Sequence, residues 1–222
     1  MGVYNFTLTM TSNERKDKTE KILVKFDIPI NVHLPLIEEE SESKIRDAKD
    51  IAKRLLVLTY LNVSAEQEDK SEIIEFLHTD DLWNAVSEDE KALFLKKELT
   101  EQETYNISWR SECIYLMLWA INKVDILEFP PRNCEISEIL KLLPDYLEPS
   151  KDFIENAKLK ATNEILDMSD LLYRLHWAVR QAGLEKKNSP RDIDPGIVQE
   201  RHYAINWITY YYDNWDDITT DT

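Results

Sequence analysis

Residues 113–121 have the sequence Cys-Ile-Tyr-Leu-Met-Leu-Trp-Ala-Ile, an apolar run inside a longer helical pattern over residues 105–123. A helix that is apolar on every side must be covered by protein on every side. The run is also far too short to cross a bilayer, which takes about 20 apolar residues. It therefore predicts a central core helix with other helices packed around it.

Seven further segments carry helical signals, which brings the expected number of helices to about eight. Ser87 with Glu90 forms a capping box at the start of one segment, and Asp194 with Pro195 forms an N-cap and first turn at the start of the last. One long segment is helical throughout or breaks near Asp167–Asp170, where Ser169 could cap a second helix. The segments are 12–26, 43–62, 70–78, 87–99, 136–143, 151–183 and 195–212.

Glycine is rare, with three residues in 222, which argues against a fold rich in tight turns and against a glycine-rich phosphate loop. Apolar residues alternate over residues 1–11 and allow one short strand, but a lone strand is not stable. The sequence thus predicts an all-α fold, a single compact multi-helix domain. Its main helical body spans residues 43–222, and residues 1–42 form an N-terminal extension with one polar helix.

The chain is acidic: 27 Lys and Arg residues stand against 43 Asp and Glu residues, a formal charge of −16 with a pI near 4.7. Nucleic acids and anionic membranes bind proteins through Lys and Arg, so this balance argues against both as partners. It suits a soluble cytoplasmic protein whose acidic surface maintains solubility or meets a basic protein partner. Cys113 and Cys134 form no Cys-x-x-Cys motif, and no signal peptide is recognisable.

Two stretches near the C-terminus place charged residues directly between large aromatic residues. They are Tyr-Arg-Leu-His-Trp-Ala-Val-Arg at 173–180 and Glu-Arg-His-Tyr-Ala-Ile-Asn-Trp at 200–207, and Trp-Asp-Asp follows at 215–217. Aromatic side chains favour dry surroundings, whereas an ionised side chain is costly to bury unless it is paired. We therefore expect a polar cluster inside an otherwise apolar body.

A helical wheel places these residues on distinct faces. Over residues 169–183, leucine, alanine and valine side chains occupy one face, and Tyr173, His176, Trp177 and Arg180 occupy the opposite one. This helix is therefore expected to contact protein on both sides. In the last helix the core stripe is expected to consist of Tyr203, Ala204, Trp207, Ile208 and Tyr211.

The central helix adds two charged residues, Arg110 and Glu112, just ahead of its apolar run. Charges at that position are not expected to stay fully solvated if the helix is central. The signs of the nearby charges permit ion pairs without fixing which cation takes which anion. The cations are Arg110, Arg174 and Arg201, and the anions are Glu112, Asp170 and Glu200.

Three interpretations of the cluster stay open: a buried ion-pair network, a pocket for an anionic or aromatic ligand, and a catalytic or metal site. The spacing matches no His-x-x-x-His or Glu-x-x-His pattern, and no Gly-x-Ser-x-Gly occurs, so we expect neither a metal nor another cofactor. The candidate binding residues are Arg110, Glu112, Arg174, His176, Trp177, Arg180, Glu200, Arg201, His202, Asp216 and Asp217.

The C-terminal tail, residues 214–222, is polar, and a polar terminus usually frays. Trp215 and Ile218 provide two apolar anchors, which would let the tail fold back and place Asp216 or Asp217 against an arginine. A solvated acidic tail is the alternative.

The same stretches carry a resemblance to a known family. They are the helix at 45–58, Trp109-Arg110-x-Glu112 with Leu118-Trp119-Ala120, the segment from Ala157-Lys158-Leu159 to Glu164-Ile165, and residues 170–180, 200–207 and 215–222. From about residue 13 to its end the chain resembles the bacterial family called domain of unknown function 4272. The resemblance implies a compact helical bacterial protein. It brings no assigned activity, so no catalytic residue follows from it.

Two functional hypotheses follow. The first is a non-catalytic cytoplasmic binding protein whose acidic surface engages a protein partner. The second is a small-molecule-binding protein or an enzyme, in which arginines of the cluster orient an anion and a histidine moves a proton near neutral pH. An open cavity beside the cluster would favour the second hypothesis, and mutually saturated side chains would count against it. The sequence leaves the oligomeric state open.

Overall fold

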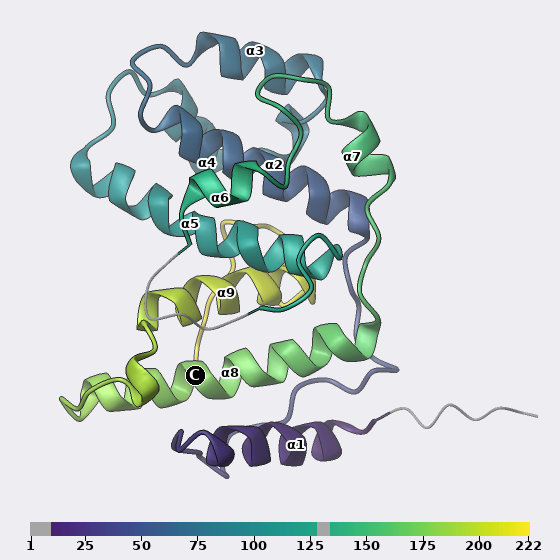
Figure 1. Cartoon of the computed structure of the whole chain (residues 1–222), viewed down its shortest axis with the longest axis vertical. Coiled ribbons are helices and arrows are strands. Elements are labelled where there is room, and N and C mark those ends of the chain that lie inside the picture. The colour runs from purple at the N-terminus through teal and green to yellow at the C-terminus, as the bar shows by residue number, and fades with distance from the viewer. Residues whose placement is uncertain (1–9, 128–133) are drawn as a thin grey trace, which may run out of the picture.

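The central apolar run lies at the C-terminal end of helix α5 (Glu101–Ala120), and its side chains other than Tyr115 are buried, as predicted. The computed structural model describes residues 10–127 and 134–222. In Figure 1, α5 lies between α2 (Ala48–Ser64) and α9 (Pro195–Ile208), and it packs against both. The side chains of Cys113 and Met117 are fully buried. Cys113 is thus a core residue, as expected of a cysteine in an apolar helix.

Two further long helices extend this arrangement into a stack. α8 (Thr162–Leu184) packs on α9, and α1 (Ser12–Lys25) packs on the outer side of α8 (Figure 1). α8 therefore contacts protein on two sides, as its wheel predicted. Four shorter elements pack against α2: α3 (Ser71–Thr79), η1 (Trp83–Ala85), α4 (Glu88–Leu95) and α7 (Lys151–Glu155). Helix α6 (Ile136–Leu140) packs on both α5 and α2, and η2 (Pro190–Asp192) packs on α8.

All regular secondary structure in the described part of the chain is helical, and this part forms one compact domain, which confirms the predicted all-α class. It holds nine α-helices, because the predicted segment 151–183 divides into α7 and α8. None of the described helices has the length and apolar character that crossing a membrane requires. The predicted short strand falls largely on residues 1–9, which lie outside the described residues.

Capping side chains fix several helix starts. The Ser87–Glu90 capping box opens α4, and the Asp194 side chain accepts the backbone N–H of Gly196 at the start of α9, both as predicted. A second box, Thr100 with Glu103, starts α5 at Glu101 rather than at residue 105. The predicted boundary was late because the first turns of α5 are polar and follow their cap rather than an apolar stripe.

Two expectations about the last helices were wrong. α8 runs unbroken through Ser169, which caps no new helix, and Asp170 binds Arg174 on the next turn. The interruption falls at residues 156–161 instead. Tyr211, expected in the core stripe, is 50% exposed. It lies past the end of α9, where the chain turns at Tyr210 with φ of +56°.

α1 attaches to the body mainly through polar groups. Its buried residues are Ser12, Arg15, Thr19 and Leu23, of which Leu23 alone is apolar. Arg15 Nε lies 3.0 Å from Asp167 Oδ1 on α8. The division into an extension at 1–42 and a main body at 43–222 stays a prediction.

Candidate functional site

The innermost charged pair of the predicted set joins α5 to α9. Arg201 Nε donates to Glu112 Oε2 at 2.8 Å, and both side chains are at most 1% exposed. The other carboxylate oxygen of Glu112 accepts the backbone N–H of Cys134 at 2.5 Å. Because the carboxylate is satisfied from two directions inside the protein, this pair acts as a structural cross-link.

A second pair lies on the side of α8 that faces α1. Arg174 donates to both oxygens of Asp170 at 2.8–3.1 Å and to the carbonyl of Pro35 at 3.1 Å. Glu20 on α1 places a carboxylate oxygen 3.8 Å from Arg174 Nη1. This pair therefore belongs to the α1–α8 interface, separate from the contact between α5 and α9.

Two histidines meet between α8 and α9. The Nδ1 atoms of His176 and His202 lie 2.9 Å apart, a contact that requires at least one ring to be neutral. Burial, aided by the positive charge of Arg180, lowers the pKa of His176 to about 4. Burial, with the neighbouring His176, lowers the pKa of His202 to about 3. Both rings are consequently uncharged at neutral pH.

The third pair, Arg110 on α5 and Glu200 on α9, is more open, with side chains 28% and 15% exposed and Nη1 3.0 Å from Oε2. Arg110 stacks over the Tyr203 ring at 4.5 Å, and Cys113 Sγ lies 3.2 Å from the Glu200 carboxylate. Burial raises the pKa of the Cys113 thiol, and it raises the pKa of Tyr203 to about 12. Neither group is therefore ionised, as a nucleophile would need to be, at neutral pH.

The partners that the sequence left open are thus Glu112 for Arg201, Asp170 for Arg174 and Glu200 for Arg110. The remaining candidates take part in none of these three pairs. Trp177 is half-buried against the core, and Arg180 is exposed and donates to Thr222 Oγ1 at 3.3 Å. Asp216 and Asp217 are exposed in the tail, where Asp216 accepts the backbone N–H of Asp89 on α4 at 3.2 Å.

Of the two alternatives for the tail, the structure shows the one in which it folds back onto the body. Asp216 and Asp217, however, accept hydrogen bonds from Asp89 and Asn214 and not from any arginine that the structure describes. Trp215 and Ile218 are 5% and 6% exposed. The ring of Trp215 packs edge-on against Tyr203 and Trp207, at centroid distances of 4.8 and 5.7 Å. Arg54 of α2 lies over the same ring at 4.3 Å. The tail is therefore held by aromatic and cationic contacts at Trp215 in addition to hydrogen bonds such as that from Asn206 Nδ2 to the carbonyl of Thr219 at 2.9 Å.

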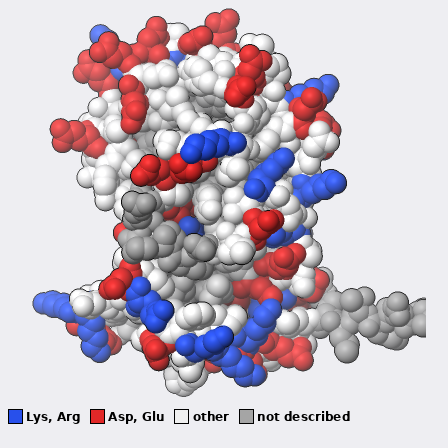
Figure 2. All heavy atoms as spheres, viewed as in Figure 1, with Lys and Arg blue, Asp and Glu red and all other residues white. Residues whose placement is uncertain are grey.

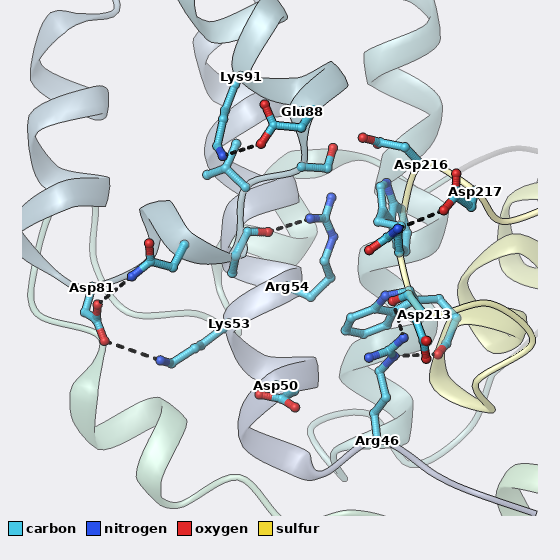
Figure 3. Close-up of a pocket in the computed structure, with 17 residues that line it drawn as sticks. Arg46, Asp50, Lys53, Arg54, Asp81, Glu88, Lys91, Asp213, Asp216 and Asp217 are labelled. Carbon is cyan, nitrogen blue, oxygen red and sulfur yellow. Dashed lines mark hydrogen bonds and ion pairs between the residues drawn. The ribbon is translucent and has the colours of Figure 1, made fainter.

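The folded tail forms one wall of a cavity of about 690 Å³, which we call the tail cavity (Figure 3). η1 and the start of α4 form the opposite wall, and the first turns of α2 lie between them. Six carboxylates and four cationic side chains line it, a surplus of two negative charges. The charged lining residues are Arg46, Asp50, Lys53, Arg54, Asp81, Glu88, Lys91, Asp213, Asp216 and Asp217.

Arg46, which no signal in the sequence singled out, binds the segment that leads from α9 into the tail. It is 8% exposed and lies between the rings of Trp207 and Tyr210, 4.2 and 4.0 Å from their centroids. Its guanidinium donates to the carbonyls of Trp207 at 2.7 Å and Asp213 at 2.6 Å. Burial lowers the pKa of Arg46. Because its partners lie about 160 residues away in sequence, no local pattern marks it.

Arg54 was missed as well, although a local signal was present. It falls on the apolar face of α2, three residues after Ile51 and one before Leu55, where a charge is unexpected. It is 3% exposed, forms an ion pair with Glu90 and donates to the carbonyl of Ala85 at 2.7 Å. Burial lowers its pKa, and the charge of Glu90 opposes that effect.

A second cavity, of about 640 Å³, borders the Arg110–Glu200 pair. Trp109 and Asn106 of α5 line it together with the N-terminal turn of α9. Arg110 is thus a predicted candidate that reaches an open space. Among the described residues, no group of three or more His, Cys, Asp or Glu side chains is placed to hold a metal ion.

Comparison with known proteins gives one match. The model of a family described as Domain of unknown function (DUF4272) matches residues 15–218, nearly the whole chain. No curated protein and no solved structure is significantly similar to it.

Proposed function

The chain belongs to the DUF4272 family, and we propose that it is a non-catalytic cytoplasmic binding protein whose acidic surface engages a basic protein partner. One observation carries this proposal: three of the four arginines of the predicted cluster, Arg110, Arg174 and Arg201, form ion pairs with acids of the same cluster. The surplus of 43 acidic over 27 basic residues is therefore left largely to the surface.

An uneven surface charge supports the same function. Figure 2 shows carboxylates gathered over the end of the molecule that carries α3, and Lys and Arg side chains gathered towards α1 and the C-terminal end of α8. Exposed charge of one sign attracts a partner of opposite sign and raises its rate of association. Buried ion pairs contribute little to such a field because their charges cancel at short range.

A fluorescent octalysine peptide tests the proposal by anisotropy, with octaglutamate as the control. We expect octalysine to bind and octaglutamate not to bind. Binding should persist at about 0.15 M salt, where the Debye length is about 8 Å and diffuse attraction is screened. Loss of octalysine binding at that salt concentration would show that the surface attracts cations without forming a site.

A second candidate function, binding or conversion of a small organic anion, is favoured by the cavity beside Arg110 and Glu200. His176 and His202 do not fit the proton-transfer role first considered, because both are 3% exposed and burial holds their pKa values near 4 and 3. Thermal shift with a panel of small carboxylates and phosphates tests this function. If the chain has this function, at least one anion should raise the Tm of the wild-type chain and fail to raise that of Arg110→Gln. If no anion of the panel raises the Tm, this function is excluded.

A further inference from the structure

We propose that the tail cavity is the place where the basic partner docks, and that it binds a peptide segment through two contacts at once. A lysine or arginine side chain of the partner meets unpaired carboxylates, and a carbonyl oxygen of the partner meets the guanidinium of Arg54. This inference rests on the function proposed above and adds its site and the chemistry of recognition.

The carboxylates of the tail cavity are only partly neutralised. Two of the six face lysines on the rim, Asp81 with Lys53 at 3.6 Å and Glu88 with Lys91 at 2.7 Å. Four others form no ion pair with any described residue: Asp50, Asp213, Asp216 and Asp217. In Figure 3, Asp213, Asp216 and Asp217 lie along the tail on one side of the cavity.

The two arginines of the lining do not remove this surplus. Arg54 is already neutralised by Glu90, which lies outside the lining. Arg46 offsets one carboxylate charge, and the charges of Asp50 and Asp213 raise its pKa against the effect of burial. Net negative charge therefore remains facing the cavity, which favours a cationic group of a ligand.

Arg54 supplies a second and independent indication of a ligand. Its two terminal nitrogens are occupied by Ala85 and Glu90, but its Nε is buried without a hydrogen-bond partner among the described residues. In Figure 3 the Arg54 side chain points into the space between Glu88 and Asp216. A buried donor without an acceptor is unfavourable. Because Nε has almost no accessible surface, a ligand's carbonyl oxygen reaches it only when the side chains that cover it move aside, and the contact then formed would be stabilising.

These two demands select the class of ligand. A simple polyamine satisfies the carboxylates but offers no acceptor to Arg54, whereas a simple anion offers an acceptor and is repelled by the carboxylates. A peptide with a basic side chain carries both groups within one residue. The volume of about 690 Å³ is that of a small-ligand pocket, so it admits one or two residues of a chain and not a folded domain.

Two probes of equal charge distinguish the contact with the carboxylates from the contact with Arg54. Acetyl-trilysine-amide carries three positive charges and backbone carbonyls, and spermidine carries three positive charges and no carbonyl. Titration calorimetry on the full chain should show about tenfold tighter binding of the peptide, the gain expected from one added hydrogen bond to a charged donor. Equal affinities would overturn the role of Arg54.

Matched variants test whether the tail cavity is the binding site. Asp216→Asn with Asp217→Asn removes two charges from the tail cavity while keeping oxygen acceptors for Asp89 and Asn214. Glu72→Gln with Glu75→Gln removes two charges from the exposed face of α3, and the diffuse attraction of those charges is screened at about 0.15 M salt. We expect about tenfold weaker peptide binding in the first variant and less than twofold in the second.

If peptide binding is weakened equally in both variants, the tail cavity is not the binding site, but the proposed function of an acidic binding protein still stands. Failure of both the trilysine and octalysine probes to bind the wild-type chain would instead reject the proposed function itself. Circular dichroism of each variant confirms that the fold is kept, and the comparison of the two probes on the wild-type chain needs no variant at all.

Discussion

Arg201 of α9 and Glu112 of α5 form an enclosed ion pair, with Nε 2.8 Å from Oε2, at the contact between the two helices. The same carboxylate fixes the backbone at Cys134. The charges that the sequence places beside its most apolar helix therefore hold the helices together.

Replacing Arg201 by Met leaves the buried Glu112 carboxylate without the cation beside it. We expect a loss of about 3–5 kcal/mol in the free energy of unfolding, measured by urea titration. Adding Glu112→Gln to that variant should restore much of the loss, because the uncompensated charge disappears. Lys141→Met, at an exposed pair with Glu138, is the control and should change little. If the losses in the free energy of unfolding of the two single variants simply add in the double variant, the two residues are not coupled.

Stability should fall on mild acidification because of His176 and His202. Their pKa values in the folded protein, about 4 and 3, lie below the value of about 6.5 in an unfolded chain. The unfolded state therefore binds more protons below pH 6.5, and stability that is present above this pH is lost as the pH falls. We expect a loss of about 2–3 kcal/mol between pH 7.5 and 5.5.

The source of that pH dependence can be isolated by substitution. His202→Leu should roughly halve the loss, and His78→Gln, at an exposed histidine on α3, should leave it unchanged. An unchanged pH dependence in His202→Leu would assign the effect to other groups.

Arg174→Ala should destabilise far more than Arg180→Ala, although both arginines lie on α8. Arg174 is 2% exposed and neutralises the fully buried Asp170, whereas Arg180 is exposed. An uncompensated Asp170 costs about 3 kcal/mol or more, which lowers Tm by about 6–12 °C in a chain of this size. Differential scanning calorimetry measures both variants, and similar Tm values for the two would place Arg174 at the surface.

Arg15→Met on α1 should leave stability unchanged or increase it. Arg15 is fully buried, and both of its terminal nitrogens are without a hydrogen-bond partner among the described residues. A methionine of similar length fills the same space without an unsatisfied charge, and Asp167 keeps Lys18 as a partner. A loss above about 2 kcal/mol in urea would show that the Arg15 nitrogens are satisfied, for instance by ordered water.

Arg46→Lys should loosen the tail. A lysine ammonium can neither stack between Trp207 and Tyr210 as a planar guanidinium does nor reach the same set of carbonyls. Chymotrypsin should therefore cleave within Tyr210–Tyr212 faster in this variant than in wild type or in Arg180→Lys. Equal cleavage rates would mean that Trp215 and Ile218 hold the tail without Arg46.

The sequence predicted features that depend on one segment and missed those that depend on several. The apolar run of α5 predicts burial whatever surrounds it. Trp215 and Ile218 offered anchors for a docked tail, with a solvated tail as the alternative. The partners of Arg110, Arg174 and Arg201 stayed open because a helical wheel gives the face of a residue but not the register between two helices.

The tail cavity could not be predicted for a related reason. Its lining comes from three stretches, residues 46–54, 81–91 and 207–217, which meet only in the folded chain. Asp216 and Asp217 were candidates because of their aromatic neighbour, and Arg54 could have been one from its place on an apolar face. Arg46 lay inside the predicted helix 43–62, but α2 begins at Ala48 after the Asp47 N-cap, so the helical periodicity did not place its side chain.

Chemical-shift mapping with acetyl-trilysine-amide tests the central claim most directly, because it can report on both cavities in one titration. The account predicts shifts at the backbone amides near Asp50, in residues 81–88 and in residues 213–217, with little change near Arg110 and Glu200. If the shifts are centred on Trp109, Arg110 and Glu200 and the amides of residues 213–217 do not shift, the proposed site is wrong and the peptide binds at the second cavity.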